Sequence, residues 1–432
     1  MIKANKKAIV LTGGGTAGHV LPHLALLPYL KTKFDKIYYI GSTKESERAL
    51  VMGAGAGCGA GAGEGCGAGA GRVAGDGRVA GAGAGSMVGR GVDEFFPLEC
   101  VKLRRGISVK NVCKNLCIPL GFIKSVRVAK SVLRKIKPDI VFSKGGFVAL
   151  PVVRSARALK IPVVAHESDA TLGLANRLSL SACDVVCTTF PSTAKTGGKF
   201  VHTGSPIRAS IYSGDRAVVT ARHFAGACND RLGTRPNLLV LGGSLGAVKI
   251  NTAVWGAQKE LCARYNVIHV CGKGKTDRHE NPKNNATHDQ QRVLVGAETG
   301  AYVSLEFVND IENYLAWADV VVSRAGSNTL CELMVLGKPT LFIPLASGRG
   351  DQIDNVNEMT KHNACGVLFE RDITPEKFVA SVGEVFKNRV TYRKNAKTAV
   401  TDGVGAICSQ IMGATRRGRA GGGLQVPAEF AP

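Results

Sequence analysis

The chain has 432 residues, with 56 Lys and Arg against 33 Asp and Glu and a formal net charge of +23. Its length favours two domains over one, and no apolar run approaches the roughly 20 residues that span a bilayer. The basic residues 1–7 lead into a strand and not into a secretory apolar segment. Because the 13 cysteines include no CxxC pair, we expect reduced thiols and a cytoplasmic location.

The positive charge is concentrated between Lys102 and Lys137, where eleven Lys and Arg occur without an acidic residue. Apolar residues are interspersed there, so the segment suits an anionic membrane surface. A solvated basic helix face is the plainer alternative. Nucleic acid is disfavoured, because Phe122 is the one aromatic residue available for base stacking. The expected membrane-binding residues are Ile107, Leu116, Ile118, Leu120 and Phe122.

The first part of the chain alternates expected strands and helices. The strands are expected at residues 8–12, 37–40, 95–98, 139–142 and 163–166, and the helices at 20–31 and 125–136. Such alternation predicts a parallel sheet covered by helices on both faces.

A second series of the same kind begins near Asn237. Its strands are expected at 238–241, 267–271, 320–323 and 340–344, with a helix at 328–336 that Gly337 ends. The sequence therefore predicts an α/β protein with two doubly wound, Rossmann-like domains facing across a cleft. Ligands in such sheets bind at the carboxyl ends of the strands.

Two segments do not fit this alternation. Residues 53–91 contain 17 glycines, mostly alternating with alanine, and show no hydrophobic period. They are expected to form a disordered insertion, because they cannot offset the conformational entropy of folding. The expected domains are 1–208 and 209–387, followed by a helix at 388–412 that returns to the first domain and a disordered tail at 413–432.

The first glycine-rich turn, Gly13-x-Gly15-x-x-Gly18, has the spacing of a dinucleotide fingerprint in a strand–turn–helix setting. The second strand lacks an acid at its end, which weakens the nicotinamide interpretation. The interpretation that remains is a loop that admits a polar ligand. His19 beside this loop is a candidate general base. The plainer alternative is that His19 only caps or packs the helix.

Two further turns precede helices. The Gly242-Gly243-Ser244 turn offers backbone donors for phosphate. The helix that follows Arg324-Ala325-Gly326 carries Glu332, which either binds ribose hydroxyls or forms a capping box with Thr329. Because the sequence has no Asp-x-Asp metal motif, backbone N–H groups and the helix dipole are expected to stabilise a diphosphate without a metal.

Several segments together resemble a known family. They are Gly14–Pro22, Lys144–Phe147, His166-Glu167, Gly204–Arg208, Gly242–Ala247, and Arg324–Gly326 with Glu332. They are similar to the bacterial glycosyltransferase family 28 enzymes that add N-acetylglucosamine to lipid I, undecaprenyl-pyrophosphoryl-N-acetylmuramyl-pentapeptide, to form lipid II for peptidoglycan. The resemblance implies a GT-B fold, a UDP-N-acetylglucosamine donor, inversion at the anomeric carbon, no cofactor or obligate metal, and a peripheral place on the cytoplasmic face of the cell membrane.

The resemblance also implies a set of site residues. His19 would be the base for the muramyl 4-hydroxyl, Arg208 would approach the diphosphate, and Glu332 would bind the ribose. The other substrate-binding residues would be Thr16, Ala17, Gly18, Asp169, Ser244, Val308, Ser327, Asn328, Thr329, Asp351 and Gln352. Asp169 stands where the family often has asparagine.

Alternative functions stay open at this point. Another UDP-sugar enzyme of the same fold, such as a glycolipid transferase or a UDP-N-acetylglucosamine 2-epimerase, is the nearest, and a dinucleotide-dependent oxidoreductase is more remote. An acidic residue could replace His19 as the base.

Overall fold

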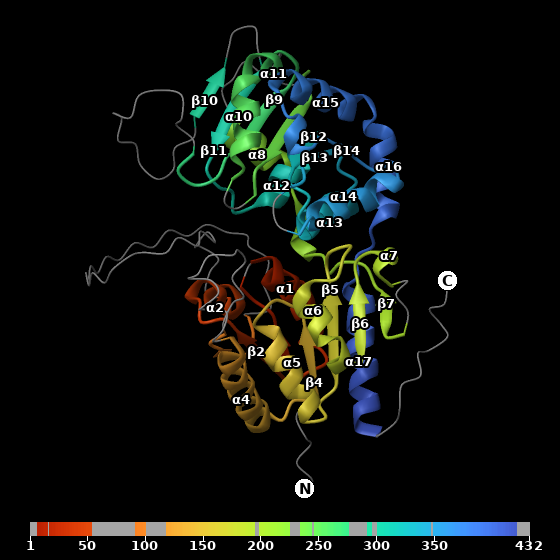
Figure 1. Cartoon of the computed structure of the whole chain (residues 1–432). Coiled ribbons are helices and arrows are strands. Elements are labelled where there is room, and N and C mark those ends of the chain that lie inside the picture. Colours follow the sequence, from red (N-terminus) through yellow and green to blue (C-terminus); the bar gives the residue numbers. More distant parts are fainter. Residues whose placement is uncertain are drawn as a thin grey trace, which may run out of the picture.

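The computed structural model describes residues 7–15, 17–53, 91–100, 118–194, 198–224, 234–243, 246–275, 292–295, 300–346 and 349–420. These residues form two α/β domains, drawn one above the other in Figure 1. The expected insertion lies outside the described residues except for its ends, Gly53 and Gly91, as do residues 421–432 of the expected tail.

The first domain contains a seven-stranded parallel sheet in the order β3-β2-β1-β4-β5-β6-β7. The strands are β1 Ala8–Thr12, β2 Lys36–Gly41, β3 Glu94–Pro97, β4 Ile140–Ser143, β5 Val163–Glu167, β6 Val185–Thr188 and β7 Phe200–His202. The helices are α1 Ala17–Leu30, α2 Glu45–Met52, α4 Ile118–Ile136, α5 Ala149–Ala158, α6 Leu174–Ser179 and α7 Pro191–Ala194.

Side chains of successive strand residues enter two different cores, one on each face of the first sheet. Ile9 and Leu11 of β1 pack in the core that α1 and α2 cover, while Val10 packs in the core that α4 and α5 cover. Because both faces are buried, these strands are apolar at almost every position, as parallel strands usually are.

The second domain repeats this design with the strand order β10-β11-β9-β8-β12-β13-β14, in which β10 alone is antiparallel. Its strands are β8 Asn237–Leu241, β9 Asn266–Val270, β10 Arg292–Val295, β11 Ala301–Leu305, β12 Val320–Ser323, β13 Thr340–Phe342 and β14 Gly366–Val367. Its helices are α8 Arg216–Phe224, α10 Val248–Gly256, α11 Gln258–Arg264, α12 Ile311–Trp317, α13 Ser327–Val335, α14 Asp351–Lys361, α15 Pro375–Lys387 and α16 Arg389–Ala399. The prediction of two doubly wound domains is confirmed.

The chain passes between the domains twice, and the two passages lie side by side. Ser205 and Asp402 form a parallel bridge, in which Ser205 N donates to Thr401 O at 3.1 Å and Gly403 N donates to Ser205 O at 2.7 Å. Gly204 has a φ of +84°, and a Cβ there would collide with the Thr401 carbonyl. The approach of the two segments therefore depends on glycine.

The C-terminal helices differ from the expected ones. The second passage falls near Asp402, so α16 stays in the second domain, where Ala396 and Ala399 are buried in its core. The last helix, α17 Val404–Ala420, packs against β4, β5 and β6 of the first domain (Figure 1). The predicted boundary at 387/388 is therefore wrong.

The expectation of disorder from residue 413 onward is also wrong for residues 413–420, which belong to α17. The apolar residues Ile407, Ile411 and Ala414 recur on one face of α17 and fill the core that α1 covers. Gly418 is needed because a Cβ there would collide with Pro162. Burial of this face outweighs the poor helix propensity of the glycines.

We predict that Ile411→Ala lowers the free energy of unfolding by about 2–4 kcal/mol, because it leaves a cavity at a fully buried position between α17 and the sheet. Equilibrium denaturation followed by far-ultraviolet circular dichroism measures the change. Ile123→Ala, at a side chain that is 46% exposed on α4, is the matched control. Equal effects of the two variants would show that α17 is not part of the core.

Candidate functional site

The site lies where the carboxyl ends of the parallel strands of the two sheets face each other. Hydrogen bonds join the facing elements, among them those from Asn328 Nδ2 of α13 to Gly18 O of α1 at 3.0 Å and from Asn355 Nδ2 of α14 to Asp169 Oδ1 at 3.0 Å. Beside the first bond is a small hollow between the domains, lined by Leu21, Pro22, Ser205, Pro206, Ile207, Arg208, Asn328 and Glu332. The cleft predicted from the sequence is therefore formed by residues of both domains.

The glycines of the first turn make room for side chains of the protein itself. A Cβ at Gly14 would collide with the Glu47 carboxylate, and one at Gly15 would collide with the Phe147 ring. The buried Glu47 accepts hydrogen bonds from Gly15 N at 3.2 Å and from Ser42 N at 2.9 Å. The N–H that a dinucleotide pyrophosphate would use is thus occupied, which counts against the oxidoreductase interpretation.

His19 lies in the first turn of α1, half-buried beside Gly146. Burial lowers the pKa of His19 from 6.5 to about 4; the Lys144 ammonium also lowers it, and the Asp169 carboxylate acts in the opposite direction. The imidazole is therefore neutral at pH 7 and able to accept a proton. A general base requires this neutral form, and the lowered pKa also makes the imidazole a weaker base than an unperturbed histidine.

The floor of the cleft is built around the buried Lys144, which follows β4. Its Nζ donates to His166 Nδ1 at 2.6 Å and to Ser168 Oγ. Because His166 Nε2 faces the carbonyl oxygen of Gly204 at 3.0 Å, the proton of this imidazole lies on Nε2. Burial lowers the pKa of Lys144 to about 8, opposed by Glu167 and Asp169, so the amine is mostly charged at pH 7.

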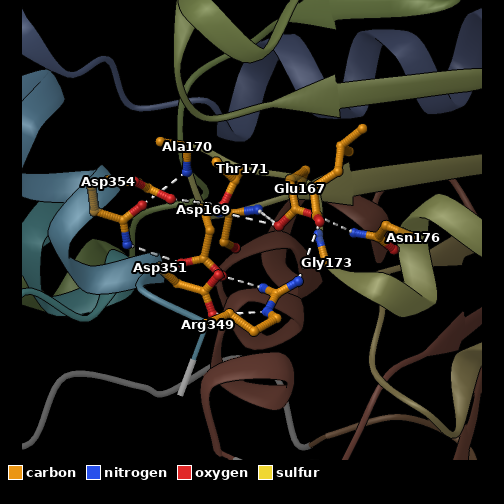
Figure 2. A network of polar contacts seen from close by, with 12 residues as sticks. Glu167, Asp169, Ala170, Thr171, Gly173, Asn176, Arg349, Asp351 and Asp354 are labelled. Atoms are coloured by element: carbon orange, nitrogen blue, oxygen red, sulfur yellow. Dashed lines mark hydrogen bonds and ion pairs between the residues drawn. The ribbon is translucent and has the colours of Figure 1, made fainter. Parts of the chain in front are cut away.

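The loop after β5 is shaped by the buried carboxylate of Glu167 (Figure 2). Its two oxygens accept from Ser168 N at 2.9 Å, Asp169 N at 3.1 Å, Gly173 N at 2.8 Å and Asn176 Nδ2 at 2.8 Å. Burial raises the pKa of Glu167, and the N–H donors hold the charged form against it. The carboxylate thus fixes the turn that presents Asp169 to the second domain.

On the other side of the cleft, Glu332 forms an ion pair with Arg208, with Nε and Oε1 separated by 2.8 Å. Both side chains are largely buried beside the hollow. The N-cap of α13 is Gly326, and no side chain caps the helix. The capping-box alternative for Thr329 and Glu332 is therefore wrong, because both residues lie inside the helix.

The remaining predicted residues fall into three groups. Ser327, Asn328 and Thr329 form the first turn of α13, and Asp351 and Gln352 form the first turn of α14. Asp351 accepts from Arg349 Nε at 3.1 Å, and Gln352 Oε1 accepts from Leu345 N at 2.9 Å. Val308 packs against the core of the second domain.

Some predicted residues lie outside this cleft or outside the described structure. Thr16, Ser244, Ile107 and Leu116 are not among the described residues, and only the backbone is described for Ala17 and Ile118. Leu120 and Phe122 lie on α4, which packs against α5. Within the described part of the chain, no three His, Cys, Asp or Glu side chains form a metal-binding group.

Four residues that shape the site were not predicted individually from the sequence: Glu47, Lys144, Glu167 and Asn355. Lys144 and Glu167 stood in motifs that the sequence offered, but no role was assigned to them. Glu47 and Asn355 carry no motif signal, because their partners are distant in the sequence.

Two facing doubly wound domains with helix N-termini at the cleft are an architecture that nucleotide-sugar glycosyltransferases use. Profiles of the glycosyltransferase family 28 N-terminal domain match residues 9–57 and 87–188, and one of the C-terminal domain matches residues 237–410. The chain is 37% identical over 411 residues to the UDP-N-acetylglucosamine--N-acetylmuramyl-(pentapeptide) pyrophosphoryl-undecaprenol N-acetylglucosamine transferase of Lachnospira eligens, covering 94% of this chain and 98% of that relative. The chain belongs to this family of transferases.

Solved structures agree on the fold. A crystal structure of Acinetobacter baumannii MurG matches with a TM-score of 0.63 at 21% identity, covering 95% of this chain and all of that one. The UDP-GlcNAc 2-epimerase of Neisseria meningitidis matches with a TM-score of 0.54 at 11% identity, covering 94% and 99%. Since transferase and epimerase share the architecture, the sequence relationship and the site decide between them.

Proposed function

We propose that the chain transfers N-acetylglucosamine from UDP-N-acetylglucosamine to the 4-hydroxyl of the muramyl sugar of lipid I, with inversion, to form lipid II. The observation that carries this proposal is the position of His19 in the first turn of α1, next to Gly18, whose carbonyl accepts the hydrogen bond from Asn328 of the second domain. The family relationship over 94% of the chain supports the same substrates.

The chemistry needs one proton acceptor and one stabilised leaving group. In the proposed step, His19 takes the proton of the acceptor hydroxyl while its oxygen attacks the anomeric carbon, and the bond from that carbon to the diphosphate breaks. UDP leaves towards the N-terminus of α13. The N–H groups of the first turn of α13 and the Arg208 guanidinium stabilise the developing negative charge.

The ion pair between Arg208 and Glu332 suggests how the nucleotide is held. Glu332 is fixed at the hollow by Arg208 at 2.8 Å, so its second oxygen is oriented before the ribose arrives. Arg208, which lines the same hollow, is the proposed cation for the diphosphate. Asp351 and Gln352, in the first turn of α14, are the proposed readers of the sugar hydroxyls.

The direct test is release of UDP from UDP-N-acetylglucosamine with and without a lipid I analogue. We expect release that depends on the analogue, together with a disaccharide product. Conversion of the donor without any acceptor into its 2-epimer would contradict the proposal and favour an epimerase.

Glu332→Ala is expected to raise KM for UDP-N-acetylglucosamine by about 30-fold, because hydrogen bonds to a charged acceptor contribute about 2 kcal/mol. Steady-state kinetics at saturating lipid I analogue measure the change. Glu384→Ala, at an exposed glutamate on α15, is the control and should leave KM unaltered. An unchanged KM in Glu332→Ala would remove the ribose role.

His19→Ala is expected to lower kcat about 10²–10⁴-fold, as loss of a positioned base does, with little change in UDP affinity. In the wild-type protein the pKa of His19 is about 4. The base form therefore persists from neutral pH downwards, and kcat/KM should fall only as the pH drops through about 4. Replacement of the exposed His362 on the C-cap of α14 is the control. An acid limb that survives unchanged in His19→Ala would point to another base.

We propose further that α4 places the enzyme on an anionic membrane. Leu120, Ile123, Lys124 and Arg127 have the spacing of one helix face, and Leu120 is 74% exposed. None of the helices in the described ranges is long and apolar enough to cross a bilayer. A surface-lying basic and apolar helix would bring the cleft to a lipid-linked acceptor at the cytoplasmic face.

Vesicle co-sedimentation tests this surface. The wild-type protein should bind phosphatidylglycerol vesicles in preference to phosphatidylcholine vesicles and should dissociate at high salt, since each basic residue contributes about 1 kcal/mol. Leu120→Ser with Ile123→Ser should weaken binding. Val390→Ser, at a side chain that is also 74% exposed but lies on α16, should not. Equal binding by both variants would reject the α4 surface.

A further inference from the structure

The carboxylate of Glu47, in the first turn of α2, is buried against the backbone of the first glycine turn. Its Oε2 accepts from Gly15 N at 3.2 Å and from Ser42 Oγ at 2.6 Å, and its Oε1 accepts from Ser42 N at 2.9 Å. Val51, one turn further along α2, is fully buried in the core of the first domain and holds the helix in place. One acidic side chain therefore connects the turn after β1 to the turn after β2.

The glycine turn lies between this carboxylate and the imidazole of His19. On one side, a Cβ at Gly14 would collide with the Glu47 carboxylate. On the other side, a Cβ at Gly146 would lie 2.7 Å from Gly14 O and 3.5 Å from His19 Cδ2. Because these contacts are made by glycine backbone, a shift of the turn disturbs the surface against which the imidazole packs.

The hydrogen-bond donors around Glu47 require a carboxylate. Gly15 N and Ser42 N can only donate, and they face different oxygens. A glutamine keeps the volume of the side chain but places its NH2 group against one of these two N–H groups. Since Ser42 Oγ can accept as well as donate, it would draw the NH2 group to the place of Oε2. Glu47→Gln therefore leaves the Gly15 N–H without an acceptor, which is costly in a partly buried place.

We infer that Glu47 is a positioning residue for the transfer reaction: it holds the glycine turn from the side opposite His19, so that the imidazole keeps its place against Gly146. The inference rests on the proposed function, in which His19 is the base. A base must lie within hydrogen-bond reach of the proton that it takes, and a displacement of about 1 Å can cost about 10²-fold in rate. Glu47 touches no reacting group in this mechanism and acts through the backbone of the turn.

The position of Glu47 predicts a separation between nucleotide binding and transfer. Glu47 lies on α2 of the first domain, whereas Glu332 and the first turn of α13, which hold UDP in the proposal, lie in the second. Loss of the carboxylate should therefore spare the affinity for UDP. It should lower the rate of the step in which the acceptor hydroxyl gives up its proton.

Kinetics of Glu47→Gln, alone and combined with His19→Ala, test the inference with UDP-N-acetylglucosamine and a soluble lipid I analogue. Glu47→Gln alone should lower kcat about 10–100-fold, and the Kd of UDP from calorimetry should change less than about twofold. In the His19→Ala background the same change should lower kcat less than about threefold, because the group that Glu47 positions is absent. A loss of kcat that is equally large in both backgrounds would overturn the inference.

The pH profile of Glu47→Gln is a readout that a loss of stability alone would not move. Burial is the largest cause that lowers the pKa of His19 to about 4; Lys144 and Arg349 also lower it, and Asp169 raises it. An imidazole that leaves its place against Gly146 gains contact with water, so its pKa should rise towards 6.5. Because the protonated ring cannot act as a base, the acid limb of kcat/KM should move to higher pH. An acid limb that stays at about 4 would contradict the inference.

Asp139→Asn is the matched control. Asp139 Oδ2 accepts from Ala8 N at 2.8 Å at the start of β1, the end of the strand that is remote from the glycine turn. The change alters a bond of the same kind, between a carboxylate and a backbone N–H of the first domain. It should lower stability without reducing kcat of the folded protein. An equal loss of kcat in Asp139→Asn and Glu47→Gln would overturn the inference.

Amide exchange provides a test that does not depend on turnover. The N–H of Gly15 should be protected in the wild-type protein and should exchange faster in Glu47→Gln. The N–H of Lys144, which donates to Thr12 O at 2.9 Å, should stay protected in both. An equal exchange rate of Gly15 in the two proteins would contradict the inference. A wild-type protein without transferase activity would instead overturn the proposed function, and Gly15 would still report whether Glu47 holds the turn.

Discussion

The approach of the two interdomain passages, at Gly204 and Gly403, is the constraint on which the cleft depends. Ser205 pairs with Thr401 and Gly403 through backbone hydrogen bonds, and any Cβ at Gly204 or Gly403 would meet the backbone of the other segment. The segments therefore lie closer together than chains with side chains allow. Because both passages run through one narrow place, movement between the domains is limited to bending about it, and the carboxyl ends of the two sheets stay opposed.

Hydrogen bonds connect the polar groups of the cleft floor to the backbone of the interdomain passage at Gly204. Lys144 donates to His166 Nδ1, and His166 Nε2 donates to the Gly204 carbonyl. Burial and Lys144 lower the pKa of His166 well below 6.5, so the ring is neutral and its tautomer is fixed from both sides. A charged ammonium on the first-domain side of the cleft is thereby linked through one ring to the backbone of the interdomain passage at Gly204. The same ammonium helps to keep His19 unprotonated.

Elements with strong local patterns could be predicted from the sequence. Elements and residues whose roles depend on partners distant in the chain could not. The strand from Ala8 to Thr12 and the strand from Val320 to Ser323 were predicted with their observed bounds. The end of α17 was missed, because its glycines suggested disorder and only packing against Pro162 explains Gly418. The family resemblance supplied Asp169 and Glu332 as single positions. It could not supply Asn355 or Glu47, whose roles depend on which side chains the fold places opposite them.

The place of α17 affects how the protein can assemble during synthesis. The first domain starts in the sequence with β1, yet its core beside α1 is filled by residues that follow the whole second domain in the chain: Ile407, Cys408, Ile411 and Ala414. A nascent chain that has emerged only as far as the second domain therefore exposes an apolar face on the first. Domains that fold in order of synthesis usually complete the N-terminal unit before the next one. Here the first domain needs α17, which follows the second domain in the chain, so the second domain can finish folding before the first is complete.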